Sequence, residues 1–415
     1  MDYFNFKGPD LYAEEIKATD LAKEYGTPLY VYSKATLHRH MNAFEDSLKD
    51  KKHLVCFAVK ACSNLAVIHE MAKLGAGFDI VSEGELRRVI AAGGDPKKVV
   101  FSGVGKSEQE IEFALTQGIS CLNIESAQEI DTVIKVAKKL NAVAPVALRV
   151  NPGVDAKTHP SISTGLKNNK FGVSEEIAFD LYKKMSKEPC LKVSGIDCHI
   201  GSQMTSGMPI IEATDKIISL YKKLLAEGIK VDHIDMGGGL GVTYDNETPP
   251  TPSEYCAPIL ERLKDLDVSI YIEPGRAMVA NACILLAKVQ YQKDNGDKHF
   301  IITDTGMNDM IRPALYGSWM TIINTTVHPD GETVKSDVVG PICESDDFLG
   351  KDRKLNVRNG DILAVRGAGA YGSSMASTYN TRRLPCEVMV DGDKSYVIKK
   401  RQSYEDIWKD EIILG

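Results

Sequence analysis

The sequence has no long hydrophobic run, few aromatic side chains and no excess of positive charge. Its apolar stretches are far shorter than the roughly 20 residues that cross a membrane, and its N-terminus lacks the basic and apolar parts of a signal peptide. It carries 50 lysines and arginines against 57 aspartates and glutamates, a formal net charge of -7. Nucleic acids and anionic membranes demand a concentrated basic surface, so we expect a small-molecule ligand and neither of those partners.

Disulfide and zinc patterns are also missing. The nine cysteines form an odd number, with no CxxC pair and no zinc-like spacing. Cys56, Cys121, Cys198 and Cys283 lie inside apolar runs, where thiols usually pack as small hydrophobic groups. This pattern favours a reducing cytoplasm and predicts no metal site.

What is present is a regular alternation of short strands and amphipathic helices. The chain has 415 residues and is 43% hydrophobic, enough for a large core. Helical periodicity is clear at 82–94 and 126–140, and apolar β-branched runs separate such segments. The runs predict eight strands, at 54–59, 78–81, 99–103, 121–125, 145–150, 194–200, 233–236 and 269–273. Eight βα units predict an α/β fold with a (β/α)8 TIM barrel.

After about residue 283 the pattern changes to hairpins. The segment 287–306 contains Asp-Asn-Gly between two alternating strands, which is a turn signal. This predicts a C-terminal all-β domain, which an early strand at 29–34 is expected to join. The expected domains are an N-terminal segment 1–35, a barrel 36–280 and a β domain 281–415.

Lys60 stands at the end of the first predicted strand, within CFAVKACSN (56–64). In TIM barrels the carboxyl ends of the strands face the active site. Apolar neighbours disfavour the charged ammonium, so we expect the pKa of this lysine to be lowered and its amine to be a better nucleophile toward an aldehyde. Read alone, Lys60 is more simply a side chain that extends to solvent, so the neighbouring motifs decide.

Two glycine-containing loops follow the seventh and eighth strands. The first, DMGGGLG (235–241), contains Gly238 and Gly239, and the second is EPGR (273–276). Loops at these positions commonly bind phosphate in this fold, because glycine amides approach an anion closely. A single glycine run indicates no more than a turn, but two at the expected positions indicate a phosphate site.

Three more polar residues are expected at the same end of the barrel. Glu273 ends the eighth strand, and Arg276 is placed to pair with an anionic group or with Glu273 itself. His199 ends the sixth strand; it is either a buried structural histidine or a flat partner for a planar ring. With Lys60 and the glycine loops, these residues predict a pyridoxal 5'-phosphate site, in which Lys60 anchors the aldehyde, Glu273 keeps the ring nitrogen protonated and the glycines hold the phosphate.

At this point the chain resembles the barrel-type (fold type III) pyridoxal-phosphate decarboxylases, and among them most closely the diaminopimelate decarboxylase family. The resemblance covers nearly the whole chain. Its motifs are LYVYS, FAVKA, FDIVSEGEL, HIGSQ, GGGLG, EPGR, RPALYG (312–317), PICESDD (341–347) and GAYGSSMASTYN (369–380).

The resemblance implies a role for each matching residue. Lys60 is the covalent anchor and His199 stacks on the cofactor ring. The expected cofactor contacts, mostly at the phosphate, come from Ser202, Gly238, Gly239, Glu273, Pro274, Gly275, Arg276 and Tyr371. The expected substrate contacts come from Arg276, Arg312, Tyr316, Glu344 and Tyr371. Cys343 is the expected proton donor, supplied across a homodimer interface by the neighbouring β domain.

Cys343 lies in a segment that departs from the family pattern. Composition alone makes this cysteine a buried hydrophobic group, but its polar setting argues against burial. The usual CESGD reads CESDD here, with Asp346 in place of glycine. A positive φ at Asp346 is costly, so the resemblance does not predict the conformation of this loop.

The reaction implied is the decarboxylation of meso-2,6-diaminopimelate to L-lysine. Its distal end is zwitterionic, which suits arginine together with an acid, here Arg276, Arg312 and Glu344. Decarboxylases of ornithine, lysine, arginine or carboxynorspermidine are the nearest alternative, since they share the cofactor parts. An inactive regulatory relative is less compatible with the sequence, because the catalytic residues are present. Alanine racemase is also less compatible, because its reaction requires a second base and does not use a CESDD segment.

Overall fold

A computed structural model describes residues 2–155 and 169–415, and the chain divides into two compact units. The first unit comprises residues 40–242 and 248–278. The second comprises residues 1–39, 243–247 and 279–415. Among the described residues, no helix combines the length and apolar character that crossing a bilayer requires.

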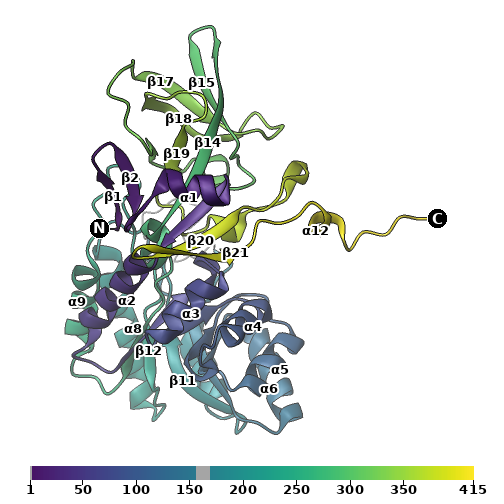
Figure 1. Cartoon of the computed structure of the whole chain (residues 1–415). Coiled ribbons are helices and arrows are strands. Elements are labelled where there is room, and N and C mark those ends of the chain that lie inside the picture. Colours follow the sequence, from purple (N-terminus) through teal and green to yellow (C-terminus); the bar gives the residue numbers. More distant parts are fainter. Residues whose placement is uncertain (1, 156–168) are drawn as a thin grey trace. The chain divides into compact units, whose positions relative to one another are not determined.

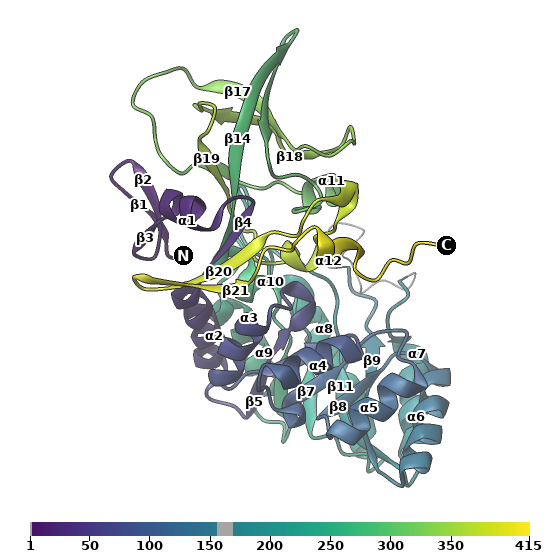
Figure 2. The ribbon, with the colours of Figure 1, turned by 45° about the vertical axis from the view of Figure 1, so that its right-hand side comes forward.

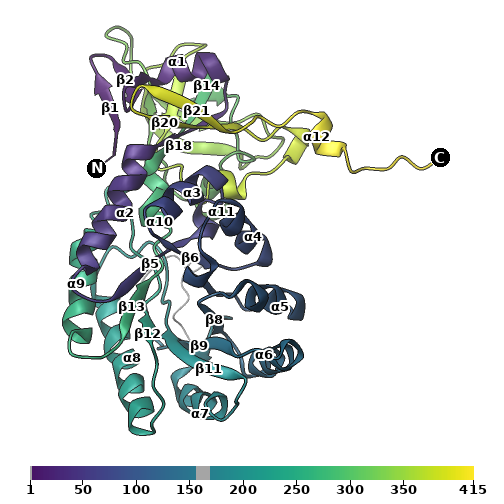
Figure 3. The same ribbon diagram turned by 60° about the horizontal axis from the view of Figure 1, so that its bottom comes forward.

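The first unit is a closed barrel of eight parallel strands (Figures 1 and 3). Each strand pairs with the next, and the last pairs with the first, where Ile270 lies opposite His53. The strands are β5 (His53–Ala58), β6 (Gly77–Ile80), β7 (Val99–Phe101), β8 (Cys121–Ile124), β9 (Ala144–Asn151), β11 (Leu191–Asp197), β12 (His233–Asp235) and β13 (Ser269–Ile272). All eight predicted strands and the TIM barrel are confirmed.

Helices surround the barrel strands on the outside (Figure 3). The predicted helices at 82–94 and 126–140 are confirmed as α4 and α6. Ser82 caps the N-terminus of α4, because its side chain accepts a hydrogen bond from the Glu85 N–H at 3.2 Å. The helices of the unit, with the end of α2, are α2 (Lys34–Leu48), α3 (Leu65–Lys73), α4 (Glu83–Ala91), α5 (Glu108–Gln117), α6 (Ala127–Leu140), α7 (Glu175–Met185), α8 (Met208–Ala226), α9 (Pro252–Leu263) and the short α10 (Arg276–Val279).

Small apolar side chains fill the interior of the barrel. Cys56, Val100, Cys121 and Ala147 form one buried cluster. Cys198 and Cys283 are buried as well, so the expectation that the thiols of the apolar runs pack as hydrophobic groups is confirmed. A barrel filled in this way has a closed centre, which leaves its strand ends for chemistry.

The second unit is built on a mixed β-sheet (Figure 2). The predicted hairpin is confirmed: β14 (Cys283–Asn295) and β15 (Lys298–Thr303) are antiparallel, and Gly296 turns between them with φ +62°. The predicted early strand is confirmed as β4 (Leu29–Ser33), which lies between β14 and β20. The remaining strands are β1 (Phe4–Lys7), β2 (Asp10–Ala13), β3 (Ile16–Lys17), β16 (Ile322–Asn324), β17 (Val334–Val339), β18 (Phe348–Leu355), β19 (Ile362–Val365), β20 (Cys386–Asp391) and β21 (Lys394–Lys399).

Candidate active site

Lys60 lies one step beyond its predicted position. Strand β5 ends at Ala58, and Lys60 belongs to a 3-10 turn, Val59–Ala61. Its side chain is 35% exposed, and its Nζ atom lies 2.5 Å from Oδ2 of Asp79, a buried residue of β6. An anionic partner favours the charged ammonium. The apolar neighbours are therefore only part of the surroundings of this amine, and Asp79 was missed although FDIV places it in a predicted strand.

His199 follows β11, two residues beyond the strand's last residue, and its ring is held by the backbone. The Gly238 N–H donates to Nδ1 of His199 at 3.1 Å, so the neutral ring carries its proton on Nε2. Burial, together with the charges of Arg149 and Lys60, holds the pKa of His199 well below its usual value. The neutral form suits a ring that packs flat against another ring. The amide of Gly238 therefore orients the histidine.

The two glycine loops pack too closely against neighbouring residues to carry a side chain. A Cβ atom at Gly239, whose φ is +111°, would lie 2.3 Å from the Met204 side chain and 2.5 Å from the carbonyl oxygen of Gly201. A Cβ atom at Gly275 would lie 3.1 Å from that of Ala58. Packing against the protein therefore accounts for glycine at both positions, and the backbone amides of such loops are also the kind that bind an anion.

Arg276 and Ser202 lie together beside these loops. The buried Arg276 donates from Nη2 to the Ser202 hydroxyl oxygen at 3.2 Å. Its alternative interpretation as a salt-bridge partner of Glu273 finds no support, because no ion pair joins the two among the described residues. Pro274, between them, accepts the Ala58 N–H at 3.2 Å and so ties the EPGR segment to β5.

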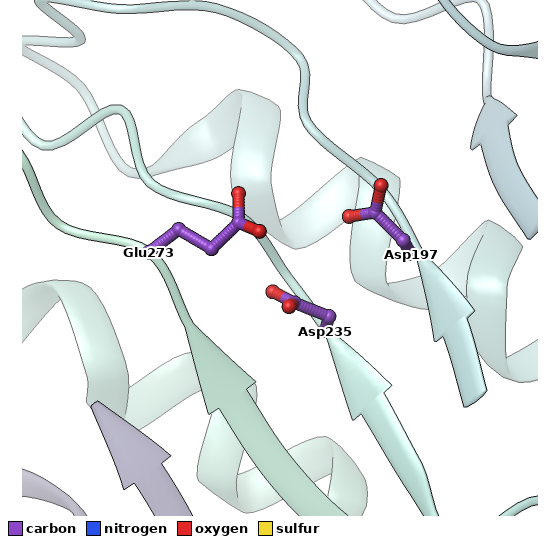
Figure 4. A group of neighbouring side chains, drawn as sticks. All are labelled: Asp197, Asp235 and Glu273. Carbon is purple, nitrogen blue, oxygen red and sulfur yellow. The ribbon is translucent and has the colours of Figure 1, made fainter. Parts of the chain in front are cut away.

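Glu273 directly follows β13 and is one of three buried carboxylates (Figure 4). Asp197 and Asp235, the last residues of β11 and β12, are the other two. Carboxylate oxygens of the three residues all lie within 4.8 Å of one another. Burial and the neighbouring negative charges raise the pKa of Glu273 well above its usual value and that of Asp235 to about 7. Sequence reasoning missed both aspartates, although each follows an isoleucine within a predicted strand.

The other predicted residues belong to the second unit. Arg312 begins α11 (Arg312–Tyr316); it is buried, and its guanidinium lies 4.4 Å from the centre of the Tyr244 ring. Tyr316 ends the same helix and is half-buried. Tyr371 is also half-buried and has a positive φ of 56°.

The CESDD segment is exposed at residues 343–346, as its polar sequence indicated, and buried only at Asp347. The Cys343 thiol is exposed, and its backbone N–H donates to Oδ1 of Asn380 at 2.9 Å. Glu344 accepts a hydrogen bond from the Tyr379 hydroxyl at 2.5 Å. Buried Asp347 fixes the segment, since it accepts the Ile342 N–H at 2.6 Å. Asp346 is absent from the described non-glycine residues with positive φ, so its side chain costs no backbone strain.

Comparisons with known proteins agree with this arrangement. The family model for the pyridoxal-dependent decarboxylase, pyridoxal binding domain, matches residues 34–280. The chain is 54% identical over 409 residues to the diaminopimelate decarboxylase of Haemophilus influenzae, covering 98% of this chain and 99% of that protein. It is also 54% identical over 416 residues to that of Vibrio cholerae, covering 100% of both.

A solved structure is similar along nearly the same length. The crystal structure of diaminopimelate decarboxylase from Helicobacter pylori complexed with L-lysine gives a TM-score of 0.91 at 43% sequence identity, covering 95% of this chain and 98% of that chain. A sequence and a fold that match over such lengths establish the relationship. The chain belongs to the pyridoxal-dependent decarboxylases, within the diaminopimelate decarboxylase family.

Proposed function

We propose that this protein decarboxylates meso-2,6-diaminopimelate to L-lysine and carbon dioxide with pyridoxal 5'-phosphate as cofactor. The observation that carries the proposal is the set of residues at the carboxyl ends of the barrel strands. An amine, a neutral histidine, a buried acid and two glycine loops occur there in a member of the diaminopimelate decarboxylase family. Each has a use toward this cofactor.

The residues fit the cofactor in charge and shape. The Lys60 amine is the group that binds its aldehyde carbon covalently, and Ser202, Gly239, Gly275 and Arg276 suit its phosphate. The Oε1 atom of Glu273 is buried and has no hydrogen-bond donor among the described residues, which suits a protonated ring nitrogen. When bound, the cofactor supplies the electron sink that lets the bond to the substrate carboxylate break.

The protein's own groups orient the reactants and move protons. Glu273 would keep the proton on the ring nitrogen, and neutral His199 would offer its flat face to the ring without adding a second positive charge. The Lys60 amine would hold the cofactor covalently between turnovers and would accept it back from the product amine. The Cys343 thiol delivers a proton to the carbon that has lost its carboxylate.

Substrate recognition is assigned to Arg276 of the first unit and to four residues of the second. Arg276 and Arg312 suit the distal carboxylate, Glu344 suits the distal ammonium, and Tyr316 and Tyr371 complete the contacts. A decarboxylase of ornithine or lysine has no distal carboxylate to bind, so the arginine at 312 favours diaminopimelate.

We further propose a homodimer in the cytoplasm with shared active sites. Cys343 and Glu344 are exposed in the single chain, whereas proton delivery and ion pairing are most effective where water is excluded. The family resemblance implies that a second copy of the chain covers these residues. Free thiols at all nine cysteines suit a reducing compartment.

Carbon dioxide release tests the proposed function. Purified protein with pyridoxal phosphate is offered meso-diaminopimelate, ornithine, lysine, arginine and carboxynorspermidine in turn. We expect the highest kcat/KM with meso-diaminopimelate, and a loss of that preference in Arg312→Gln. Faster turnover of ornithine or lysine by the unaltered protein would rule out this substrate.

A further inference from the structure

Asp235 lies beside Glu273, at the end of the neighbouring strand, with its carboxyl group turned toward it (Figure 4). One oxygen of Asp235, Oδ1, accepts the Gly237 N–H at 2.9 Å. The other, Oδ2, is buried and has no hydrogen-bond donor among the described residues, and the same holds for Oε1 of Glu273. Two bare carboxylate oxygens repel each other, and a hydrogen bond between them requires a proton.

The nearby cations are each paired with another acid, although the charge of Lys60 partly offsets the rise that burial causes in the pKa of Asp235 and of Glu273. Lys60 is paired with Asp79 at 2.5 Å, and Arg149 with Glu125 at 3.2 Å. Asp197 adds a third acid, with carboxylate oxygens of the three within 4.8 Å. Within residues 2–155 and 169–415, Asp197, Asp235 and Glu273 form no ion pair with a basic side chain. Buried carboxylates at such distances do not all ionise, because desolvation and mutual repulsion both favour the protonated form.

We propose that Asp235 is a positioning residue for Glu273, and that the two carboxyl groups share one proton at neutral pH. This inference rests on the proposed function. When a protonated ring nitrogen lies against Glu273, the shared proton remains with Asp235, which then donates a hydrogen bond to the ionised Glu273. The Gly237 N–H fixes Asp235, Asp235 fixes Glu273, and Glu273 is held toward the ring. The pKa of Asp235, raised to about 7 by burial, agrees with a proton kept at this pair.

The arrangement predicts that asparagine replaces Asp235 well and alanine does not. In Asp235→Asn the amide oxygen still accepts the Gly237 N–H, and the amide N–H₂ donates to Glu273, as a protonated carboxyl group does. Titration of the cofactor into cofactor-free protein measures the Kd. We expect a Kd within about threefold of the parent value for Asp235→Asn. For Asp235→Ala we expect binding about tenfold weaker or more, because the ionised Glu273 loses a hydrogen bond to its charged carboxylate. Equal weakening in both variants would overturn the proposal, since it would show that the charge of Asp235 is needed.

Infrared spectroscopy of the cofactor-free protein reports the proton directly. At neutral pH we expect the spectrum of the parent minus that of Asp235→Asn to contain the carbonyl stretch of one protonated carboxylic acid, because Glu273 ionises in the variant. The protonated fraction of Glu85 is common to both proteins and cancels in the difference. Glu273→Gln should remove the same band, which keeps the test valid if one variant fails to fold. Asp197→Asn is the matched control and should keep the band. A band of equal intensity in the parent and in Asp235→Asn, or one that Asp197→Asn alone removes, would overturn the proposal.

Two further outcomes separate this inference from its rivals. Calorimetric binding of Mn²⁺ to the cofactor-free protein, lost in Asp235→Asn, would make the three carboxylates a metal site and contradict the shared proton. If the parent protein releases no carbon dioxide from meso-diaminopimelate, the proposed function fails. The infrared band and its dependence on Asp235 need neither substrate nor cofactor, so they still decide whether the proton is shared.

Discussion

The predicted acid and arginine of the barrel unit are buried, whereas the predicted site residues of the CESDD segment in the β unit are exposed. In the barrel unit, Glu273 and Arg276 are each 6% exposed, so both side chains are buried. In the β unit, Cys343 and Glu344 are exposed on a segment that buried Asp347 holds in place. A site for a cofactor is thus preorganised in one unit, whereas the groups proposed to act on the substrate are presented on a surface. The difference indicates that the exposed segment of the β unit is the part that needs a second copy of the chain.

The largest effect is expected from the barrel half. Lys60→Ala removes the amine that anchors the cofactor, so the visible absorbance of the covalently bound cofactor should be lost and kcat should fall by roughly 10³-fold or more. Absorbance spectra and carbon dioxide release measure both. Lys98→Ala is the matched control, because Lys98 precedes β7 at the other end of the barrel and donates to the Gly75 carbonyl at 2.9 Å. A normal absorbance band in Lys60→Ala would disprove the role of Lys60.

The next effect is expected from the exposed half. Cys343→Ala removes the proposed proton donor, so kcat should fall by about 10²-fold while the absorbance of the bound cofactor stays unchanged. Steady-state kinetics and spectra check this. Cys190→Ala, at a partly buried cysteine of the barrel unit, is the control. An unchanged kcat in Cys343→Ala would leave the exposed segment without a catalytic role.

The sequence was sufficient to predict the regular parts of both units. Eight strands and the β14–β15 hairpin follow from apolar periodicity and turn residues, because these depend on local pattern. The ends of the strands were less accurate: Lys60 lies in a turn that begins at Val59, since the barrel strand stops where its pairing with β6 stops at Ala58. Periodicity carries no information on that last pairing.

The polar partners of the site were beyond sequence reasoning. Asp79, Asp197 and Asp235 look like ordinary strand residues, and only barrel closure brings them near Lys60 and Glu273. In the same way, the hydrogen bond from Tyr379 to Glu344 joins positions 35 residues apart. Contacts of this kind depend on tertiary structure, whereas motifs report only which residues occur.

A buried acid of the barrel unit is expected to make the free energy of unfolding depend on pH. Glu85 of α4 accepts the Val81 N–H at 2.7 Å, and burial raises its pKa from 4.5 to about 7. The folded protein therefore holds a proton that the unfolded chain has released in this range, and the free energy of unfolding falls as pH rises through it. Relative to Glu85→Gln, the parent should lose roughly 1 to 3 kcal/mol between about pH 5 and about pH 8.

Denaturant unfolding of both proteins at several pH values measures this. Glu254→Gln is the control of opposite sign, because hydrogen bonds from Thr251 lower the pKa of the exposed Glu254. That carboxylate contributes stability that is lost as pH falls. Parallel pH profiles for Glu85→Gln and the parent would show that Glu85 keeps no proton.

The smallest effect is expected from a tyrosine that contacts the exposed segment of the β unit. Tyr379→Phe removes the hydroxyl that orients Glu344, so KM for diaminopimelate should rise by about three- to tenfold, with less change in kcat. The absorbance of the bound cofactor should not change. Tyr404→Phe, at another exposed tyrosine of the same unit, is the control. A fall in kcat at constant KM would contradict a role in substrate recognition.

The most direct test of a site shared between two chains combines two inactive variants. Lys60→Ala lacks the anchor and Cys343→Ala lacks the proton donor, so neither pure protein should be active. After the two are dissociated, mixed and reassociated, half of the dimers contain one of each, and each of these has one intact site. We predict recovery of about a quarter of the parent activity; mixed dimers with no recovered activity would contradict a shared site.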